Sequence, residues 1–237
     1  QSWGMTALIV GARKEAGGGV REGWSVFRGT QNLVGLFSFE DNTTPKPEEI
    51  LDKRGIFDDY NGKCNYQITT GVVGNFDTEG WGVIKYTNLT STGEPGQDVL
   101  WVDTDFPLFR LGDVYLMYAE AVARGGEGGD INTAVGYVNE LRDRAYGETP
   151  HNKIDAAWLT ANNYQNILDE RGRELYWEGV RRIDLIRFGK YTSSSYTWPA
   201  KGGVITGVGV NERYNIFPIP ISDISVNGSL EQNEGYK

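Results

Sequence analysis

The sequence predicts a mainly α-helical fold made of tetratricopeptide-type helix pairs, long irregular loops and a few short strands. Two back-to-back helices are expected at 108–145, and a charge-dense helix is expected at 164–187. Two antiparallel helices over roughly 34–40 residues match the length of a tetratricopeptide unit. No linker interrupts the 237 residues, so we expect one domain with a loop-rich part at 1–105, a helical part at 106–190, and a loop with an extended segment at 191–237.

The part before the helices is rich in Gly, Asn, Asp and Thr, which are residues of turns and loops. Its segment 16–24, AGGGVREGW, is typical of an exposed loop. Three runs have the composition of short strands, and they lie at Tyr66–Thr70, Gly82–Tyr86 and Val99–Val102. We expect no sustained helix in 55–105.

The first predicted helix is apolar on two sides. One stripe at helical spacing runs from Leu111 to Val122, while Leu116, Met117 and Ala121 fall off that stripe. A helix of this kind is sandwiched between neighbours. Because stacked repeats bury their faces on one another, we expect exposed apolar surface on this helix if the neighbouring repeats are absent.

Glycines and an acid predict where the first helix ends and the second begins. Two Gly-Gly pairs at 125–126 and 128–129 interrupt the helical pattern, and Asp130 follows them as an N-cap. The second helix repeats the apolar spacing. On its polar face, Glu140 and Arg144 lie four residues apart and are expected to pair.

The third predicted helix carries many charges of both signs. Glu174 and Glu178 lie one turn apart, and a carboxylate pair can perform acid–base chemistry. Alternating signs along one helix, however, favour internal neutralisation. Arg171 and Glu178 share a stripe with apolar residues, so we expect a partly buried ion pair between them and a structural role for this helix.

The end of the chain is predicted to be non-helical. A loop rich in Gly and Ser occupies 191–211, and a short extended segment follows at Tyr214–Pro220. Pro218 and Pro220 fix their own φ angles and disfavour helix before them.

Composition excludes several classes of function. A net charge of −9 without a basic stripe disfavours binding to nucleic acid. One Cys, Cys64, leaves no internal disulfide, and one His, His151, leaves few options for histidine metal sites or a Ser-His-Asp triad. The calcium-loop and phosphate-loop spacings are missing. We therefore expect no cofactor and no metal.

Three sequence blocks carry a joint signal through their order and spacing. The first is RLGDVYLMYAEAVARGG with AVGYVNELRDRAYG, within 110–147. The second is ILDERGRELYWEGVRRIDLIRFGKY at 167–191, and the third is NIFPIPISDISVNGSLEQNEGY at 215–236. Together they resemble the SusD/RagB family, which are glycan-binding lipoproteins on the outer membrane of Bacteroidetes.

The resemblance implies a function and a location. It implies binding of an oligosaccharide or polysaccharide at the cell surface and its delivery to a SusC-like TonB-dependent transporter for nutrient uptake. It implies no reaction, and it implies a lipid anchor in the outer membrane that lies outside this chain. Members of the family are about twice as long, so we expect the chain to be the C-terminal part of such a protein.

The chain departs from the family's usual residues at four positions: Gly112, Gly172, Val180, where His is common, and Glu234, where Pro is frequent. Gly112 and Gly172 stand where the family commonly has Ala. A Gly inside a helix costs about 0.5–1 kcal/mol of stability relative to Ala. We expect these differences to affect stability and not function.

Tryptophans in predicted loops are the candidate ligand-binding residues. Trp3, Trp24 and Trp81 lie beside glycines or polar residues, and Arg28 follows Trp24 by four positions. An indole face stacks on the C–H face of a sugar ring with little loss of entropy. We predict that these four residues contact the glycan. The remaining tryptophans are expected to fill the core; they are Trp101, Trp158, Trp177 and Trp198.

Two other functions compete with glycan capture. One is a protein-interaction repeat without a ligand of its own. The other is a glycoside hydrolase, which would place two carboxylates across a cleft, about 5–10 Å apart.

Overall fold

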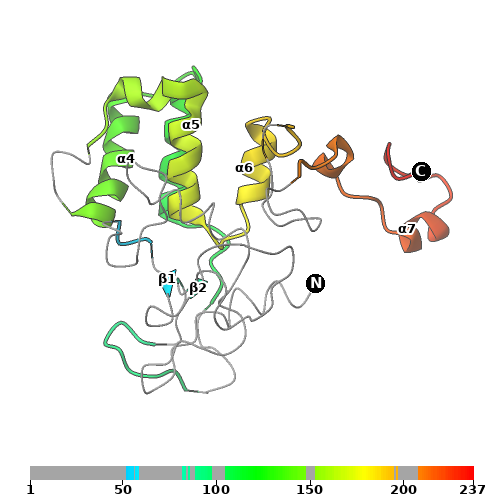
Figure 1. Ribbon diagram of the computed structural model, residues 1–237, viewed down its shortest axis with the longest axis horizontal. Helices are drawn as coiled ribbons and strands as arrows, with labels where there is room; N and C mark the ends of the chain where they lie inside the picture. Colours follow the sequence, from blue (N-terminus) through cyan, green and yellow to red (C-terminus); the bar gives the residue numbers. More distant parts are fainter. Residues whose placement is uncertain are drawn as a thin grey trace.

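The computed structural model describes residues 52–55, 57–58, 82–83, 85, 89–97, 105–147, 153–194, 196 and 208–237. These residues are mainly helical, which confirms the predicted fold class (Figure 1). The elements are β1 (Phe57–Asp58), β2 (Gly82–Val83), α3 (Leu111–Ala123), α4 (Ile131–Tyr146), α5 (Ala156–Leu175), α6 (Arg181–Arg187), the 3-10 helix η4 (Glu212–Asn215) and α7 (Ile221–Val226).

Helices α3, α4 and α5 pack on one another and enclose the core. Helix α3 contacts both α4 and α5, and α4 also contacts α5. Figure 1 shows α4 and α5 side by side, with α6 beyond α5. The core consists of apolar residues from the three helices and from the connection before α5: Leu116, Ala119, Ala134, Val138, Leu141, Ile154, Leu159 and Ile167.

The turn between α3 and α4 has the predicted cap. Asp130 accepts hydrogen bonds from the backbone N of Thr133 at 2.7 Å and from its hydroxyl at 2.8 Å. Gly125 and Gly128 have φ angles of +87° and +78°, a region that residues with a Cβ rarely adopt. The two glycine pairs and the acid therefore end one helix and start the next, as predicted.

The prediction of one helix over 164–187 is wrong. Helix α5 begins earlier, at Ala156, breaks at 161–164, and ends at Leu175. Trp177 and Gly179 have φ angles of +62° and +78°, so the chain turns between α5 and α6. Charge periodicity could not reveal this turn because acids and bases continue on both sides of it.

The described strands are short. Strands β1 and β2 pair antiparallel, with Phe57 opposite Val83 and Asp58 opposite Gly82. The strand predicted at Gly82–Tyr86 is thus confirmed at its start, whereas the runs Tyr66–Thr70 and Val99–Val102 lie outside the described residues.

The C-terminal segment contains a helix that the sequence pattern did not predict. Residues 212–215 form η4, the chain is extended from Ile216 to Pro220, and α7 follows. The expectation of one extended segment over Tyr214–Pro220 is therefore correct only in part. Pro220 is compatible with this boundary because proline is tolerated where a helix begins.

Side chains fold the C-terminal segment back on itself. The Gln232 amide bonds both the backbone N and the carbonyl of Ile219, at 2.8 and 2.9 Å. Arg182 of α6 ties the segment to the helices by donating to the carbonyls of Tyr214 and Asn215, at 2.5 and 3.2 Å. In Figure 1, α7 and the C-terminus lie at the far end of the molecule from α4 and α5.

One face of α3 is apolar and exposed, in keeping with the apolar second side that its sequence predicts. Leu111, Val114 and Met117 are 61%, 47% and 44% exposed. Ala121 is the remaining exposed residue of this helix, so the exposed face of α3 has no charged side chain. None of the helices in the described ranges combines the length and apolar character of a membrane span.

Two neighbouring residues of α3 provide a test of this arrangement. Leu116→Ala should lower the free energy of unfolding by about 2–5 kcal/mol, because Leu116 is fully buried. Met117→Ala should change it by less than about 0.5 kcal/mol. Urea denaturation of both variants measures the difference. An equal loss in Met117→Ala would mean that this face is covered.

Candidate functional site

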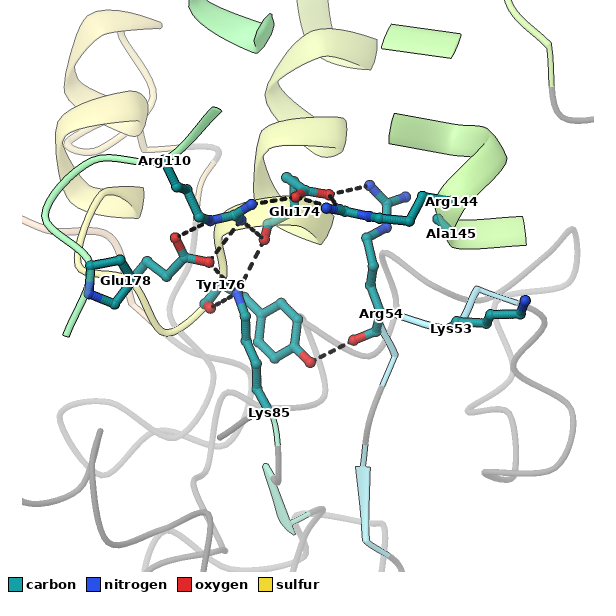
Figure 2. Close-up of a pocket in the computed structure, with 10 residues that line it drawn as sticks. Lys53, Arg54, Lys85, Arg110, Arg144, Ala145, Glu174, Tyr176 and Glu178 are labelled. Atoms are coloured by element: carbon teal, nitrogen blue, oxygen red, sulfur yellow. Dashed lines mark hydrogen bonds and ion pairs between the residues drawn. The ribbon is translucent and has the colours of Figure 1, made fainter. Parts of the chain in front are cut away.

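A hollow of about 400 Å³ lies where the end of α5 meets the segments that carry Arg54, Lys85 and Arg110. Most of its lining side chains are charged (Figure 2). The lining residues are Lys53, Arg54, Lys85, Pro107, Arg110, Arg144, Ala145, Glu174, Tyr176 and Glu178.

Glu174 lies at the centre of these charges. Its Oε1 accepts hydrogen bonds from Arg110 at 2.5 Å and from Arg144 at 2.6 Å. Its Oε2 accepts from Arg144 at 2.7 Å and from Arg54 at 3.1 Å. Figure 2 shows these guanidinium groups converging on the carboxylate. Both oxygens are therefore fully engaged.

Basic side chains also bond the carboxylate of Glu178 and the backbone carbonyls at the end of α5. Glu178 accepts from Nε and Nη2 of Arg110, at 2.6 and 2.8 Å, and it also bonds Lys85. Lys85 Nζ donates to the carbonyls of Glu174 and Tyr176, at 3.1 and 2.9 Å. Carbonyls at a helix C-terminus lack partners within the helix and carry partial negative charge, so the ammonium group stabilises this end.

A second buried carboxylate lies one turn earlier on α5. Glu170 accepts from Arg54 at 2.8 Å, from Arg142 at 2.9 Å and from Arg173 at 2.8 Å. Arg54 also contacts Asp52, at 2.6 Å. We call the whole set the glutamate–arginine network: Asp52, Arg54, Lys85, Arg110, Arg142, Arg144, Glu170, Arg173, Glu174 and Glu178.

The network holds its two central acids in the charged form. Burial would raise the pKa of Glu170, but the charges of Arg173, Arg54 and Arg142 outweigh burial and lower the pKa to about 2. Burial opposes ionisation of Glu174 as well, and hydrogen bonds from Arg144 and Arg110 lower its pKa to about 2. Neither group holds a proton near neutral pH, so neither can act as a general acid there.

Two ion pairs expected from the sequence are replaced by others. Arg171 does not pair with Glu178; its Nε lies 2.9 Å from Asp184, and its Nη1 lies 2.9 Å from Asp113. The expectation assumed a continuous helix, but Glu178 lies beyond the end of α5. Arg144, expected to pair with Glu140, bonds Glu174 instead.

Gly112 leaves room for this site. A Cβ at Gly112 would lie 2.6 Å from Nη1 of Arg110 and 2.8 Å from Oε1 of Glu174. Both distances are too short for a carbon atom, so an Ala would force these side chains apart. Gly112 therefore keeps the helix-propensity cost expected from the sequence. In return, it allows the ion pair of Arg110 and Glu174 to lie close to the helix backbone.

The hollow is not shaped for stacking on a sugar. Tyr176 is buried, and its hydroxyl donates to the carbonyl of Arg54 at 2.5 Å. Lys85 lies over the ring, with Nζ 4.5 Å from the ring centroid. The aromatic surface in this hollow is thus occupied by the protein itself. Within the described ranges, no three His, Cys, Asp or Glu side chains could hold a metal ion together.

The sequence-predicted ligand residues Trp3, Trp24, Arg28 and Trp81 lie outside the described residues, and they remain predictions. Trp158 packs against the core, which confirms the structural role expected for it. Trp177 is half-buried in the turn after α5. Trp101 and Trp198 also lie outside the described residues.

Removing one charge from the network should destabilise the protein strongly. Glu170→Gln leaves Arg54, Arg142 and Arg173 without their shared carboxylate, and the expected loss is about 3–5 kcal/mol of unfolding free energy. Glu127→Gln, on the exposed turn between α3 and α4, is the matched control and should be neutral. Similar unfolding midpoints in urea for both variants would contradict a stabilising role.

The low pKa values also predict how stability depends on pH. Folding lowers the pKa of Glu170 and Glu174 from 4.5 to about 2, so their contribution is complete above about pH 4.5 and is lost as the pH falls towards about 2. Urea unfolding at a series of pH values measures this loss. Glu174→Gln should reduce the pH dependence in that window, and Glu127→Gln should retain it. An identical pH profile for both variants would exclude the acids of the network as its cause.

Comparison with known proteins identifies a family match and curated relatives for this chain. The model of the SusD family matches residues 7–236. A curated relative, the starch-binding protein SusD of Bacteroides thetaiotaomicron, is 41% identical over 186 residues, which are 78% of this chain and 31% of the relative. The SusD-like protein P25 of Formosa agariphila is 31% identical over 135 residues, which are 55% of this chain and 24% of that protein. The chain thus spans about a third or less of the curated relatives that it matches.

Two solved structures of the SusD superfamily match parts of the chain. A SusD superfamily protein from Parabacteroides distasonis is 21% identical with a TM-score of 0.49, over 88% of this chain and 47% of the other. One from Bacteroides fragilis is 26% identical with a TM-score of 0.47, over 79% of this chain and 38% of the other. The family model alone covers nearly the whole chain, and on that match the protein belongs to the SusD family.

Proposed function

We propose that this protein binds a glycan at the bacterial cell surface and delivers it to a SusC-like TonB-dependent transporter for nutrient uptake. The observation that carries the proposal is membership of the SusD family, together with 41% identity to a protein named for starch binding. A lipid-anchored position on the outer membrane belongs to the same proposal.

Binding without catalysis is the form of the proposal that the described residues favour. A hydrolase of the two-carboxylate type needs an acid that holds a proton near neutral pH. The central acids of the network, Glu170 and Glu174, are held ionised by several arginines each. Their geometry fits a rigid scaffold better than a reacting pair.

The proposed glycan contacts are Trp3, Trp24 and Trp81, with Arg28 bonding hydroxyl groups. Stacking in open sites without extensive enclosure gives modest affinity, with Kd values on the order of µM to mM. In this proposal, helices α3–α5 and the network serve as the scaffold, and the predicted loops serve as the recognition elements. This division of roles rests on residue chemistry and on the family relation.

Calorimetry with a panel of neutral and acidic oligosaccharides, including starch fragments, tests the proposal. At least one glycan should bind, and Trp24→Ala or Trp81→Ala should weaken binding by about tenfold or more. Phe109→Ala is the control, since Phe109 is an aromatic residue that is 84% exposed and is not a proposed contact.

Each alternative function predicts a different result in the same experiment. Release of reducing sugar would favour the hydrolase. An absence of binding to every glycan, combined with binding to the transporter, would favour the interaction repeat. Binding that none of the tryptophan variants changes would leave glycan capture in place and exclude these residues as the site.

A further inference from the structure

The turn after α7 places an asparagine directly before a glycine. Asn227 follows the helix, with φ −119° and ψ 93°, and Gly228 and Ser229 continue the turn. All three residues are exposed. The turn is closed by a hydrogen bond from the backbone N of Leu230 to the carbonyl of Asn227, at 3.0 Å.

The side chain of Asn227 is folded over the backbone that follows it. Its Oδ1 accepts from the backbone N of Ser229 at 3.1 Å. This arrangement, an Asx turn, keeps the side-chain amide carbon close to the intervening peptide nitrogen, that of Gly228. Among the described residues, the Gly228 nitrogen has no hydrogen-bond acceptor, so no hydrogen bond has to break before it reacts.

No residue in the described part of the chain crowds the Gly228 position. Gly228 has no Cβ, and an added Cβ would meet no atom within 4 Å. Helix α7 contributes no buried residue, so loosening the turn breaks no core packing. Segments with few buried contacts open at low free-energy cost.

We propose that Asn227–Gly228 is a site of spontaneous deamidation in the folded protein. The deprotonated nitrogen of Gly228 attacks the side-chain amide carbon of Asn227, a C–N bond forms, and the side-chain nitrogen leaves as ammonia. Water then opens the resulting succinimide at one of its two carbonyl carbons and gives aspartate or isoaspartate. The balance is loss of ammonia and gain of water, with no change of oxidation state.

The product changes the end of α7. A new carboxylate stands at the C-terminus of the helix, where the helix dipole already places negative charge. Isoaspartate also adds a methylene group to the backbone and moves the carbonyl that accepts from Leu230. Conversion to isoaspartate therefore disrupts the hydrogen bonds of the turn, whereas conversion to aspartate keeps them and adds the charge.

The chain contains a matched control for the role of glycine. Asn211 is exposed, and its Oδ1 accepts from the backbone N of Arg213 at 3.0 Å, which is the same Asx arrangement. The residue that follows it is Glu212, whose side chain hinders the approach of its own nitrogen and restricts its φ and ψ. Asn211 should therefore react several-fold more slowly than Asn227.

Mass spectrometry of the folded protein after incubation in mildly alkaline buffer tests the proposal. Trypsin separates peptide 202–213, which contains Asn211, from peptide 214–237, which contains Asn227. The latter should gain about 1 Da with time, and fragment ions should place the gain at Asn227. Peptide 55–63 holds a second Asn–Gly pair, Asn61–Gly62, and is resolved separately.

Two reciprocal variants test whether the residue after each asparagine sets its rate of deamidation. Gly228→Ala should slow the reaction at Asn227 several-fold, and Glu212→Gly should accelerate it at Asn211. Equal rates at Asn227 and Asn211 in the unaltered protein would overturn the proposal. It would equally be overturned if Asn227 gained mass in urea but not in the folded protein.

Discussion

Two buried carboxylates, Glu170 and Glu174, set the architecture of the described part of this protein. A charge taken out of water is costly unless it is paired and hydrogen-bonded, and each of these acids is bonded by three arginines. The arginines come from α4, from α5 itself, from the residue before α3 and from the segment before β1. The charges of Glu170 and Glu174 are therefore neutralised only when these parts of the chain meet at the end of α5.

The sequence reveals the helix pair and its cap because those features are local. The glycines before Asp130, the cap itself and the apolar spacing of α3 each depend on residues a few positions apart. The turn at Trp177 and the partners of Arg171 are not local, since they depend on where the chain lies after α5 ends. Arg54 and Lys85 bond acids that lie 116 and 93 positions away, so the residues around them could not predict their place in the network. The predicted tryptophan site lies outside the described residues.

We propose a scaffold role for the glutamate–arginine network and glycan contact for the tryptophans, and this division of roles is consistent with the SusD family relation. The hollow at the end of α5 has its charges neutralised and its aromatic ring covered by Lys85, so it is suited to holding segments together. A glycan site of modest affinity instead needs open aromatic faces. That need is the reason for the prediction that Trp3, Trp24 and Trp81 contact the ligand, and it remains a prediction.

The spacing of the network along the chain also has a kinetic consequence. Glu174 bonds arginines that lie 30, 64 and 120 positions away in the sequence. Contacts this distant close large loops, and their entropy cost delays them relative to the local pairing of α3 with α4. The network should therefore be largely unformed in the folding transition state, and its bonds would act mainly by slowing unfolding. Slow unfolding of this kind prolongs the lifetime of the folded state even where it does not speed folding.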